Sequence, residues 1–191
     1  MIFYLVIGPP ASGKYTIGKV LSQKLDISYI HEHNILDIVS EFDMPNNYTK
    51  ILEYLNLRLY IARRYLKTSK KDLISTMVVD FNKPLHISFL KKTSEILEEI
   101  NGTLIIIELF VIQKIRLERN MKDDRLFYKP TKQDIEKSTN KILELDKLTS
   151  LNSKKINLEE FGENILHIKV KNEKSKSDAV SKILLEIKRR L

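Results

Sequence analysis

The sequence predicts an α/β fold with a mostly parallel sheet that is covered by helices on both faces. Short apolar runs rich in β-branched residues alternate along the chain with stretches whose apolar residues recur at helical spacing. The first run, Ile2 to Ile7, is apolar or aromatic throughout and is closed by Gly-Pro-Pro, which is typical of a strand buried on both faces. No repeat or interdomain linker interrupts the alternation, so we expect a single domain over residues 1–191.

Each element has its own signal. Leu73 to Val79 is an apolar run that ends at Asp80. Asn101-Gly102 is a helix stop before Thr103 to Phe110, which has the strongest strand signal of the chain. Asn34, Thr131 with Asp134, and Ser177 are suitable helix caps. The stretch 148–163 is polar and predicted to be irregular. The other strands are expected at 27–30, 73–79, 103–110 and 165–170, and helices at 13–25, 34–42, 48–70, 84–100, 112–121, 131–147 and 177–191.

Composition narrows the chemistry. The net charge is +8 and the pI about 9.4, which fits either polyanionic ligands or a lysine-rich solvated surface. The chain has no Cys, which excludes disulfides, thiolate metal sites and Cys nucleophiles. The N-terminal apolar run lacks a basic flank, and no other run is long enough to span a bilayer, so we expect a cytoplasmic protein that does not bind membranes.

The segment after the first strand carries the most specific motif. It reads Gly-Pro-Pro-Ala-Ser-Gly-Lys-Tyr-Thr, and it lies between an apolar strand and a helical pattern. Glycines allow the backbone to approach phosphate oxygens, the helix N-terminus adds partial positive charge, and the lysine neutralises the β- and γ-phosphates. The motif therefore predicts a nucleoside triphosphate site, and the residues expected to contact the nucleotide are Gly8, Pro9, Ala11, Ser12, Gly13, Lys14, Tyr15 and Thr16.

One position departs from the phosphate-loop fingerprint. Tyr15 stands where a Ser or Thr hydroxyl usually helps to hold Mg²⁺. Thr16 offers a hydroxyl one residue later. Either Mg²⁺ is held by Thr16, other ligands and water, or metal binding is weakened. The departure leaves open a nucleotide-binding regulator that has lost catalysis.

With these motifs, the chain resembles the small P-loop kinases, a group that includes shikimate kinase, nucleoside monophosphate kinases and chloramphenicol phosphotransferase. It is most similar to small bacterial kinase-like proteins labelled shikimate-kinase-like or AAA-family ATPases. The phosphate loop is the most specific part of the likeness, which covers most of the chain. The other similar segments are Ile30-His-Glu-His-Asn34, Arg119-Asn-Met-Lys-Asp-Asp-Arg125, Tyr128-Lys-Pro-Thr131 and Leu151-Asn-Ser153.

The resemblance implies a three-layer P-loop NTPase fold with a five-stranded parallel sheet of order 2-3-1-4-5. It also implies ATP as phosphate donor, with Mg²⁺, and a small Arg-rich lid around 119–133. In such kinases lid arginines stabilise charge on the transferring phosphoryl group, and Arg119 and Arg125 match them here. Arg116 lies three residues before Arg119 on the same helical face. A solvated cationic face is the alternative explanation for these arginines.

Departures from the resembling kinases bear on the acceptor. The Gly triplet that shikimate kinases carry after the third strand is missing here. His31 and His33 stand at positions where shikimate kinases have acidic residues. The stretch from Asp80 to Pro84 replaces the Asp-Gly-Phe-Pro-Arg of nucleoside monophosphate kinases, and its Lys83 is a candidate to contact a substrate anion. These differences argue against a true shikimate kinase and leave the acceptor unidentified.

The remaining polar candidates have either a functional or a structural interpretation. His31 and His33, two residues apart, either contact the acceptor, act as a base or bind metal, or are structural. Asp80 either orients Mg²⁺-bound water or accepts the acceptor's proton, or it forms a turn. Glu108 interrupts an apolar strand and needs a partner if it is buried. Asp37 and Glu32 are weaker candidates.

Three functions follow from these observations. The first is a phosphotransferase in which Lys14 binds ATP, Arg119 and Arg125 cover the phosphates, Asp80 serves catalysis, and His31, His33 and Lys83 hold a small acceptor. The second is a nucleic-acid-associated NTPase or polynucleotide kinase, motivated by the charge, although aromatic and basic residues are not interleaved for base stacking. The third is the catalytically weak regulator. The sequence leaves open ATP against GTP, and monomer against dimer.

Overall fold

In a computed structural model of the protein, the described residues are 1–121, 134–154 and 156–191. The strands are β1 (Ile2–Ile7), β2 (Ser28–Ile30), β3 (Leu73–Met77), β4 (Thr103–Phe110) and β5 (Ile165–Lys171). The helices are α1 (Lys14–Leu25), α2 (Glu32–Ser40), α3 (Asn47–Ser69), α4 (Pro84–Glu98), α5 (Gln113–Asn120), α7 (Ile135–Leu148), α8 (Lys176–Arg190) and the 3₁₀ helix η2 (Leu158–Phe161).

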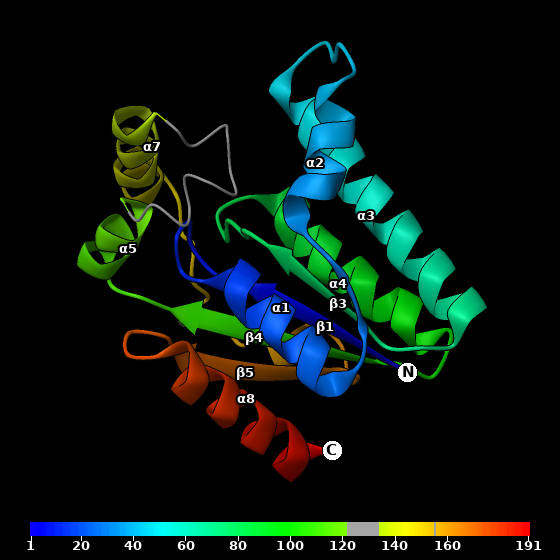
Figure 1. The fold of residues 1–191 in the computed structure, drawn as a ribbon. Coiled ribbons are helices and arrows are strands. Elements are labelled where there is room, and N and C mark those ends of the chain that lie inside the picture. Colours follow the sequence, from blue (N-terminus) through cyan, green and yellow to red (C-terminus); the bar gives the residue numbers. More distant parts are fainter. Residues whose placement is uncertain (122–133, 155) are drawn as a thin grey trace.

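The five strands form one parallel sheet in the order β2-β3-β1-β4-β5, which confirms the predicted topology. β1 is central, and its last residue, Ile7, lies between Met77 of β3 and Glu108 of β4. Because all the strands run the same way, their carboxyl ends share one edge, where open α/β sheets bind ligands. The segment that joins β1 to α1 leaves the sheet in the middle of this edge (Figure 1).

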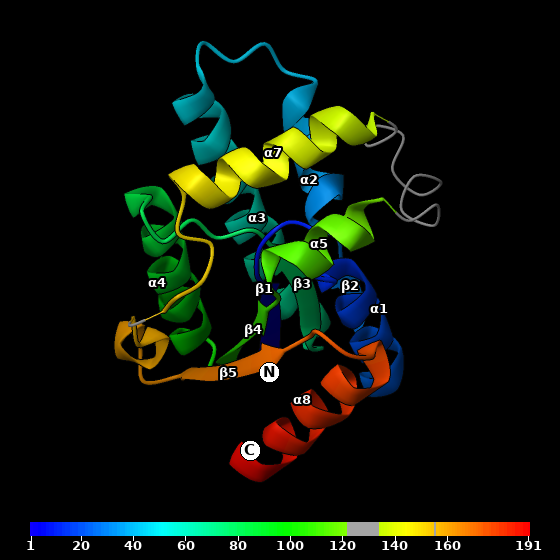
Figure 2. The same cartoon turned by 90° about the vertical axis from the view of Figure 1, so that its left-hand side faces the viewer.

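Alternate side chains of the strands supply two apolar cores, one on each face of the sheet. In β1, Phe3, Leu5 and Ile7 pack with residues of α2, α3 and α4, whereas Tyr4 and Val6 pack with residues of α1 and α8. Figure 1 and Figure 2 show α1 and α8 on one face and α3 and α4 on the other. Because both faces are covered, the strands read as continuous apolar runs.

Two helices begin earlier than the sequence suggests, because other side chains cap them. The Nδ1 atom of His31 accepts the backbone N–H of His33, so α2 begins ahead of Asn34, the expected cap. The hydroxyl of Ser175 caps α8, so that helix also begins ahead of the expected cap, Ser177. In both places the earlier acceptor satisfies the first unpaired backbone N–H groups.

Three further boundaries differ or stay partly untested. β3 ends at Met77, two residues before the predicted end. Asp134 caps α7 alone among the described residues, since Thr131 lies outside them. Part of the stretch expected to be irregular forms η2, which Asn157 caps.

α3 is the longest helix of the fold within the described ranges, and it packs along α2 and α4. It begins after Asn46, whose side chain accepts the N–H of Thr49. Its buried side carries Tyr54, Leu55 and Arg58 toward the sheet. Neither α3 nor another helix in those ranges is long and apolar enough to cross a membrane.

α5 and α7 form a paired arm beside the carboxyl edge of the sheet (Figure 2). The Arg116 guanidinium of α5 donates to the carboxylate of Asp146 in α7, and Asn120 donates to the Ser138 hydroxyl at 2.7 Å. These buried polar contacts fix the two helices to each other. Most of the lid expected around 119–133 lies outside the described residues, so the lid stays a prediction.

Candidate functional site

The loop after β1 turns sharply because three of its residues have positive φ angles. These angles are +146° at Gly8, +61° at Ala11 and +93° at Gly13. A Cβ added at Gly8 would lie 2.8 Å from the carbonyl oxygen of Leu109, so β4 leaves no room for a side chain there. α1 then begins at Lys14 without a side-chain cap, which leaves its first backbone N–H groups available to an anion.

Side chains of this loop provide further hydrogen-bond donors beside those backbone N–H groups. The Lys14 ammonium donates to the carbonyls of Gly8 and Pro9 at 2.8 and 2.9 Å, and the residue is only 8% exposed. The Ser12 hydroxyl is buried and has no hydrogen-bond partner among the described residues. A buried ammonium, a buried hydroxyl and a helix N-terminus in one turn form a donor set that fits phosphate oxygens.

Three rings gather beside the loop and form what we call the aromatic wall: Tyr15, His31 and His33. The Tyr15 ring meets the His31 ring edge to face, with centroids 4.9 Å apart, and the two imidazoles stack at 5.0 Å. His33 lies in α2 rather than in extended chain, yet its ring still lies against that of His31. Thr16, the proposed metal ligand, is exposed on α1. No three His, Cys, Asp or Glu side chains of the described residues are grouped to hold a metal.

Asp80 follows β3 and forms turns. It is 5% exposed, and its Oδ1 atom accepts the backbone N–H groups of Asn82 at 3.0 Å and of Ser150 at 3.1 Å. Its own N–H donates to Nδ1 of His86 at 2.8 Å. Burial lowers the pKa of His86, more than the neighbouring carboxylate raises it. Lys83 precedes α4 and is exposed.

Glu32, a weaker candidate from the sequence, is held by hydrogen bonds at the carboxyl edge of the sheet. Its Oε1 atom accepts the backbone N–H of Val78 at 3.1 Å and the Tyr54 hydroxyl at 3.5 Å, so its carboxylate lies across the ends of β2 and β3. The useful signal in the sequence was its place directly after a strand, in the first turn of a helix, where carboxylates are favoured.

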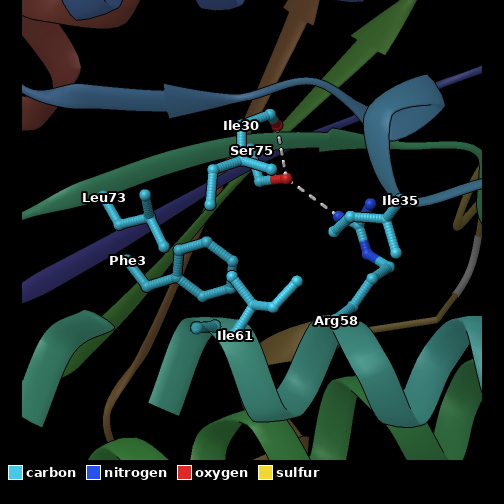
Figure 3. Close-up of a pocket in the computed structure, with 8 residues that line it drawn as sticks. Phe3, Ile30, Ile35, Arg58, Ile61, Leu73 and Ser75 are labelled. Carbon is cyan, nitrogen blue, oxygen red and sulfur yellow. Dashed lines mark hydrogen bonds between the residues drawn. The ribbon is translucent and has the colours of Figure 1, made fainter. Parts of the chain in front are cut away.

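Arg58 is linked to Glu32 through the Tyr54 hydroxyl. The guanidinium is buried and donates to the Tyr54 hydroxyl, the Ser75 hydroxyl and the Thr76 carbonyl at 3.0 to 3.1 Å. Figure 3 shows this guanidinium beside Ser75, which donates in turn to the carbonyl of Ile30. Burial raises the pKa of Tyr54, which keeps its hydroxyl a donor toward Glu32. The small pocket next to Arg58 is mainly apolar and is lined by Phe3, Ile35, Ile61, Ala62 and Leu73.

Arg119 reaches the phosphate loop from α5. Its guanidinium donates to the carbonyl of Asn172 at 2.8 Å and lies 3.5 Å from the carbonyl of Ser12. The structure therefore brings Arg119 next to Ser12 and Gly13 of the phosphate loop, whereas Arg116 contacts Asp146. Arg125, its expected companion, lies outside the described residues. Asn172 was missed, because an Asn in a polar turn carries no distinguishing signal in a sequence.

Glu108 has the partner that a buried carboxylate needs. It accepts hydrogen bonds from the side chains of His167, Ser153 and Asn152 and from the backbone N–H of Ser153. Burial alone would raise the pKa of Glu108, but these hydrogen bonds outweigh burial and hold the pKa below its usual value. The loop after α7 is thereby tied to β4, next to the phosphate loop.

No protein-family model matches the sequence, and no curated protein matches it significantly. Solved structures share its fold. A sugar kinase from a Janibacter species matches with TM-score 0.62 and 11% identity over 98% of this chain and 95% of that one. A gluconokinase from Sinorhizobium meliloti gives 0.58 and 12% over 98% and 91%, and a shikimate kinase from Acinetobacter baumannii, solved with shikimate, gives 0.54 and 18% over 100% and 94%. The chain therefore has the fold of the P-loop kinases.

Proposed function

We propose that this protein is a phosphotransferase that moves the γ-phosphoryl group of ATP to a small-molecule acceptor. The loop after β1 carries the proposal, because it combines the buried Lys14 ammonium, the buried Ser12 hydroxyl and the uncapped start of α1. That donor set is matched to a polyphosphate. Arg119 lies beside it, where a cation stabilises charge on a transferring phosphoryl group.

The nucleotide would be bound by the loop backbone and Lys14, with Arg125 added on the basis of the sequence alone. Mg²⁺, when bound, neutralises charge that develops on the β- and γ-phosphates. We propose Thr16 and Asp80 as the residues that hold its hydration shell. Thr16 is exposed on the first turn of α1, and Asp80 is a carboxylate at the carboxyl edge of the sheet.

The acceptor side is formed by Glu32, Asp80, Lys83 and the two histidines of the aromatic wall. By their names, the three similar structures are kinases of a sugar, gluconate and shikimate, which supports an acceptor that carries hydroxyl groups. Glu32 is the best-placed group to receive a hydroxyl proton, because Val78 and Tyr54 hold its carboxylate at the ends of β2 and β3.

The two alternative functions are supported by fewer observations. A nucleic-acid-associated NTPase is supported only by the net charge of +8. A catalytically weak regulator is supported by Tyr15, whose ring packs against His31 instead of offering a short-chain hydroxyl to a metal. Both alternatives share nucleotide binding with the leading proposal and differ from it in phosphoryl transfer.

The first test is ATP binding with and without Mg²⁺, for the unaltered protein, Lys14→Ala and Lys24→Ala. Lys24 is an exposed lysine in the last turn of α1, so its replacement is the matched control. We expect Lys14→Ala to weaken ATP binding by roughly 10- to 100-fold, which corresponds to the loss of one charge-assisted interaction. Lys24→Ala should bind as the unaltered protein does. No ATP binding by the unaltered protein would overturn the proposal.

A second test separates transfer from binding. An acceptor screen with polyols, sugars, sugar acids and nucleosides should yield a phosphorylated product for one class. Glu32→Gln should then reduce transfer by roughly 100-fold, the usual contribution of a general base, while ATP binding stays unchanged. ATP binding without transfer to any acceptor would favour the regulator, and steeply salt-dependent RNA binding would favour the nucleic-acid alternative.

A further inference from the structure

The turn after β5 contacts the phosphate loop through one side chain, that of Asn172. Its Nδ2 atom donates to the carbonyl oxygen of Ser12 at 2.8 Å, across 160 positions of sequence. The residue is 4% exposed, and its backbone N–H donates to the carbonyl of Phe110 at 3.0 Å. Asn172 is therefore held by the end of β4 while its side chain holds the phosphate loop.

The fit between Asn172 and the loop is close. A Cβ added at Gly13 would lie 2.7 Å from Asn172 Nδ2. Gly13 also has a φ of +93°, a conformation that residues with a side chain rarely adopt. The Asn172 amide thus packs on the residue that precedes α1, and position 13 requires glycine both for its backbone angle and for the space that Asn172 occupies.

The Asn172 hydrogen bond has a consequence inside the loop. The peptide unit between Ser12 and Gly13 is planar and trans, so its C=O and N–H groups point in opposite directions. Because Asn172 holds the Ser12 carbonyl on the outside of the loop, the Gly13 N–H is turned to the other side. Backbone N–H groups turned inward are the donors by which such a loop binds phosphate.

Two more observations support this arrangement. Arg119 reinforces it, since its guanidinium donates to the Asn172 carbonyl at 2.8 Å and lies 3.5 Å from the Ser12 carbonyl. The second observation is that the Ser12 hydroxyl and the Asn172 Oδ1 atom are buried, and neither has a hydrogen-bond partner among the residues that the structure describes. The Ser12 carbonyl fixes the orientation of the Asn172 amide, because only the Nδ2 atom can donate to a carbonyl.

We propose that Asn172 is a positioning residue for the triphosphate, acting through the Ser12–Gly13 peptide. The inference rests on the proposed function, because it assumes that the loop binds ATP. It adds a requirement for a donor at position 172 that the phosphate-loop motif does not contain. Asn172 does not touch the nucleotide in this role; it orients the group that does.

The test measures the affinity for Mg-ATP and for inorganic tripolyphosphate, which carries no base or sugar. Asn172→Asp keeps the size but places a carboxylate against the Ser12 carbonyl. Asn172→Leu removes the donor without adding charge, and Asn172→Ala removes it without filling the space. The matched control is Asn157→Asp at the start of η2, where the side-chain oxygen that caps the turn is retained. Melting temperatures are measured in parallel.

We expect Asn172→Leu and Asn172→Ala to lower the affinity for both ligands by roughly fivefold, which corresponds to the loss of one neutral hydrogen bond. Asn172→Asp should lower it by at least roughly tenfold, because the carboxylate also repels the Ser12 carbonyl. Asn157→Asp should bind normally. Unchanged affinity in all three variants at position 172 would overturn the inference, and so would failure of Asn172→Ala to fold, since the residue would then be structural. If the unaltered protein binds neither ligand, the proposed function fails first and this inference with it.

Discussion

The Nε2 atom of His167 and the Oε2 atom of Glu108 lie 2.8 Å apart between β5 and β4, in the interior of the sheet. Their side chains are 4% and 0% exposed. The same carboxylate accepts the N–H and hydroxyl of Ser153, each at 2.7 Å. One buried anion therefore connects two strands and the loop that follows α7, close to the residue where the phosphate loop leaves β1.

Replacing this anion should destabilise the protein. Glu108→Ala leaves the donors of His167, Ser153 and Asn152 without their acceptor, and we expect a loss of about 3 to 5 kcal/mol in the free energy of unfolding. Glu108→Gln retains one acceptor oxygen and should lose less. Urea denaturation followed by circular dichroism measures both. Equal stability of Glu108→Ala and the unaltered protein would show that this network does not support the fold.

The stability of the protein should decrease as the pH falls below about 6.5. The pKa of His86 is lowered in the folded state, chiefly by burial, so the unfolded chain binds the proton more readily. This contribution is fully present above the unfolded pKa and is lost as the pH falls toward the folded pKa. A single group changes stability by at most about 1.4 kcal/mol per pH unit.

The variant His86→Asn isolates this effect from the other histidines. An Asn oxygen can accept the Asp80 N–H in place of Nδ1, and it does not titrate in this range. Denaturation midpoints between pH 5 and pH 7.5 should therefore vary less for His86→Asn than for the unaltered protein. The same pH dependence in both would assign it to other groups.

The contact between Arg116 and Asp146 should matter for the α5–α7 arm rather than for phosphate binding. Their side chains are 6% and 17% exposed, so Asp146→Ala leaves a nearly buried guanidinium unpaired. We expect a loss of about 3 kcal/mol in stability. The double variant Arg116→Met with Asp146→Leu should recover most of it, because apolar side chains of similar volume need no partner. ATP affinity that falls only in the double variant would instead give Arg116 a role at the nucleotide.

Tyr15 allows a test of the metal site. Tyr15→Ser removes the ring that meets His31 edge to face and should lower the free energy of unfolding by about 1 kcal/mol, whereas Tyr15→Phe should not. If the missing short-chain hydroxyl limits metal binding, Tyr15→Ser should also reduce the Mg²⁺ concentration needed for half-maximal ATP hydrolysis. Magnesium titrations of the three proteins measure this. An unchanged requirement in Tyr15→Ser would remove Tyr15 from the account of metal binding.

Local signals explain which parts of the fold could be predicted. Each strand is a short continuous run, and each helix has an apolar period of its own, so their order and types follow from neighbouring residues. The predicted helix starts were less accurate, because several possible capping residues stand within a few positions of each other. For α8, the choice between Ser175 and Ser177 depends on the path of the preceding turn. The phosphate loop could be identified because all its residues are contiguous.

By itself, the sequence determined the alternation of strands and helices, the phosphate loop after the first strand, and the need of Glu108 for a partner. The tertiary structure alone decided that this partner is His167, that Glu32 lies across the ends of β2 and β3, and that Asn172 holds the phosphate loop. The physical reason is separation along the chain. A contact between Ser12 and Asn172 spans 160 positions and is formed only when β1 and β5 join the same sheet on either side of β4.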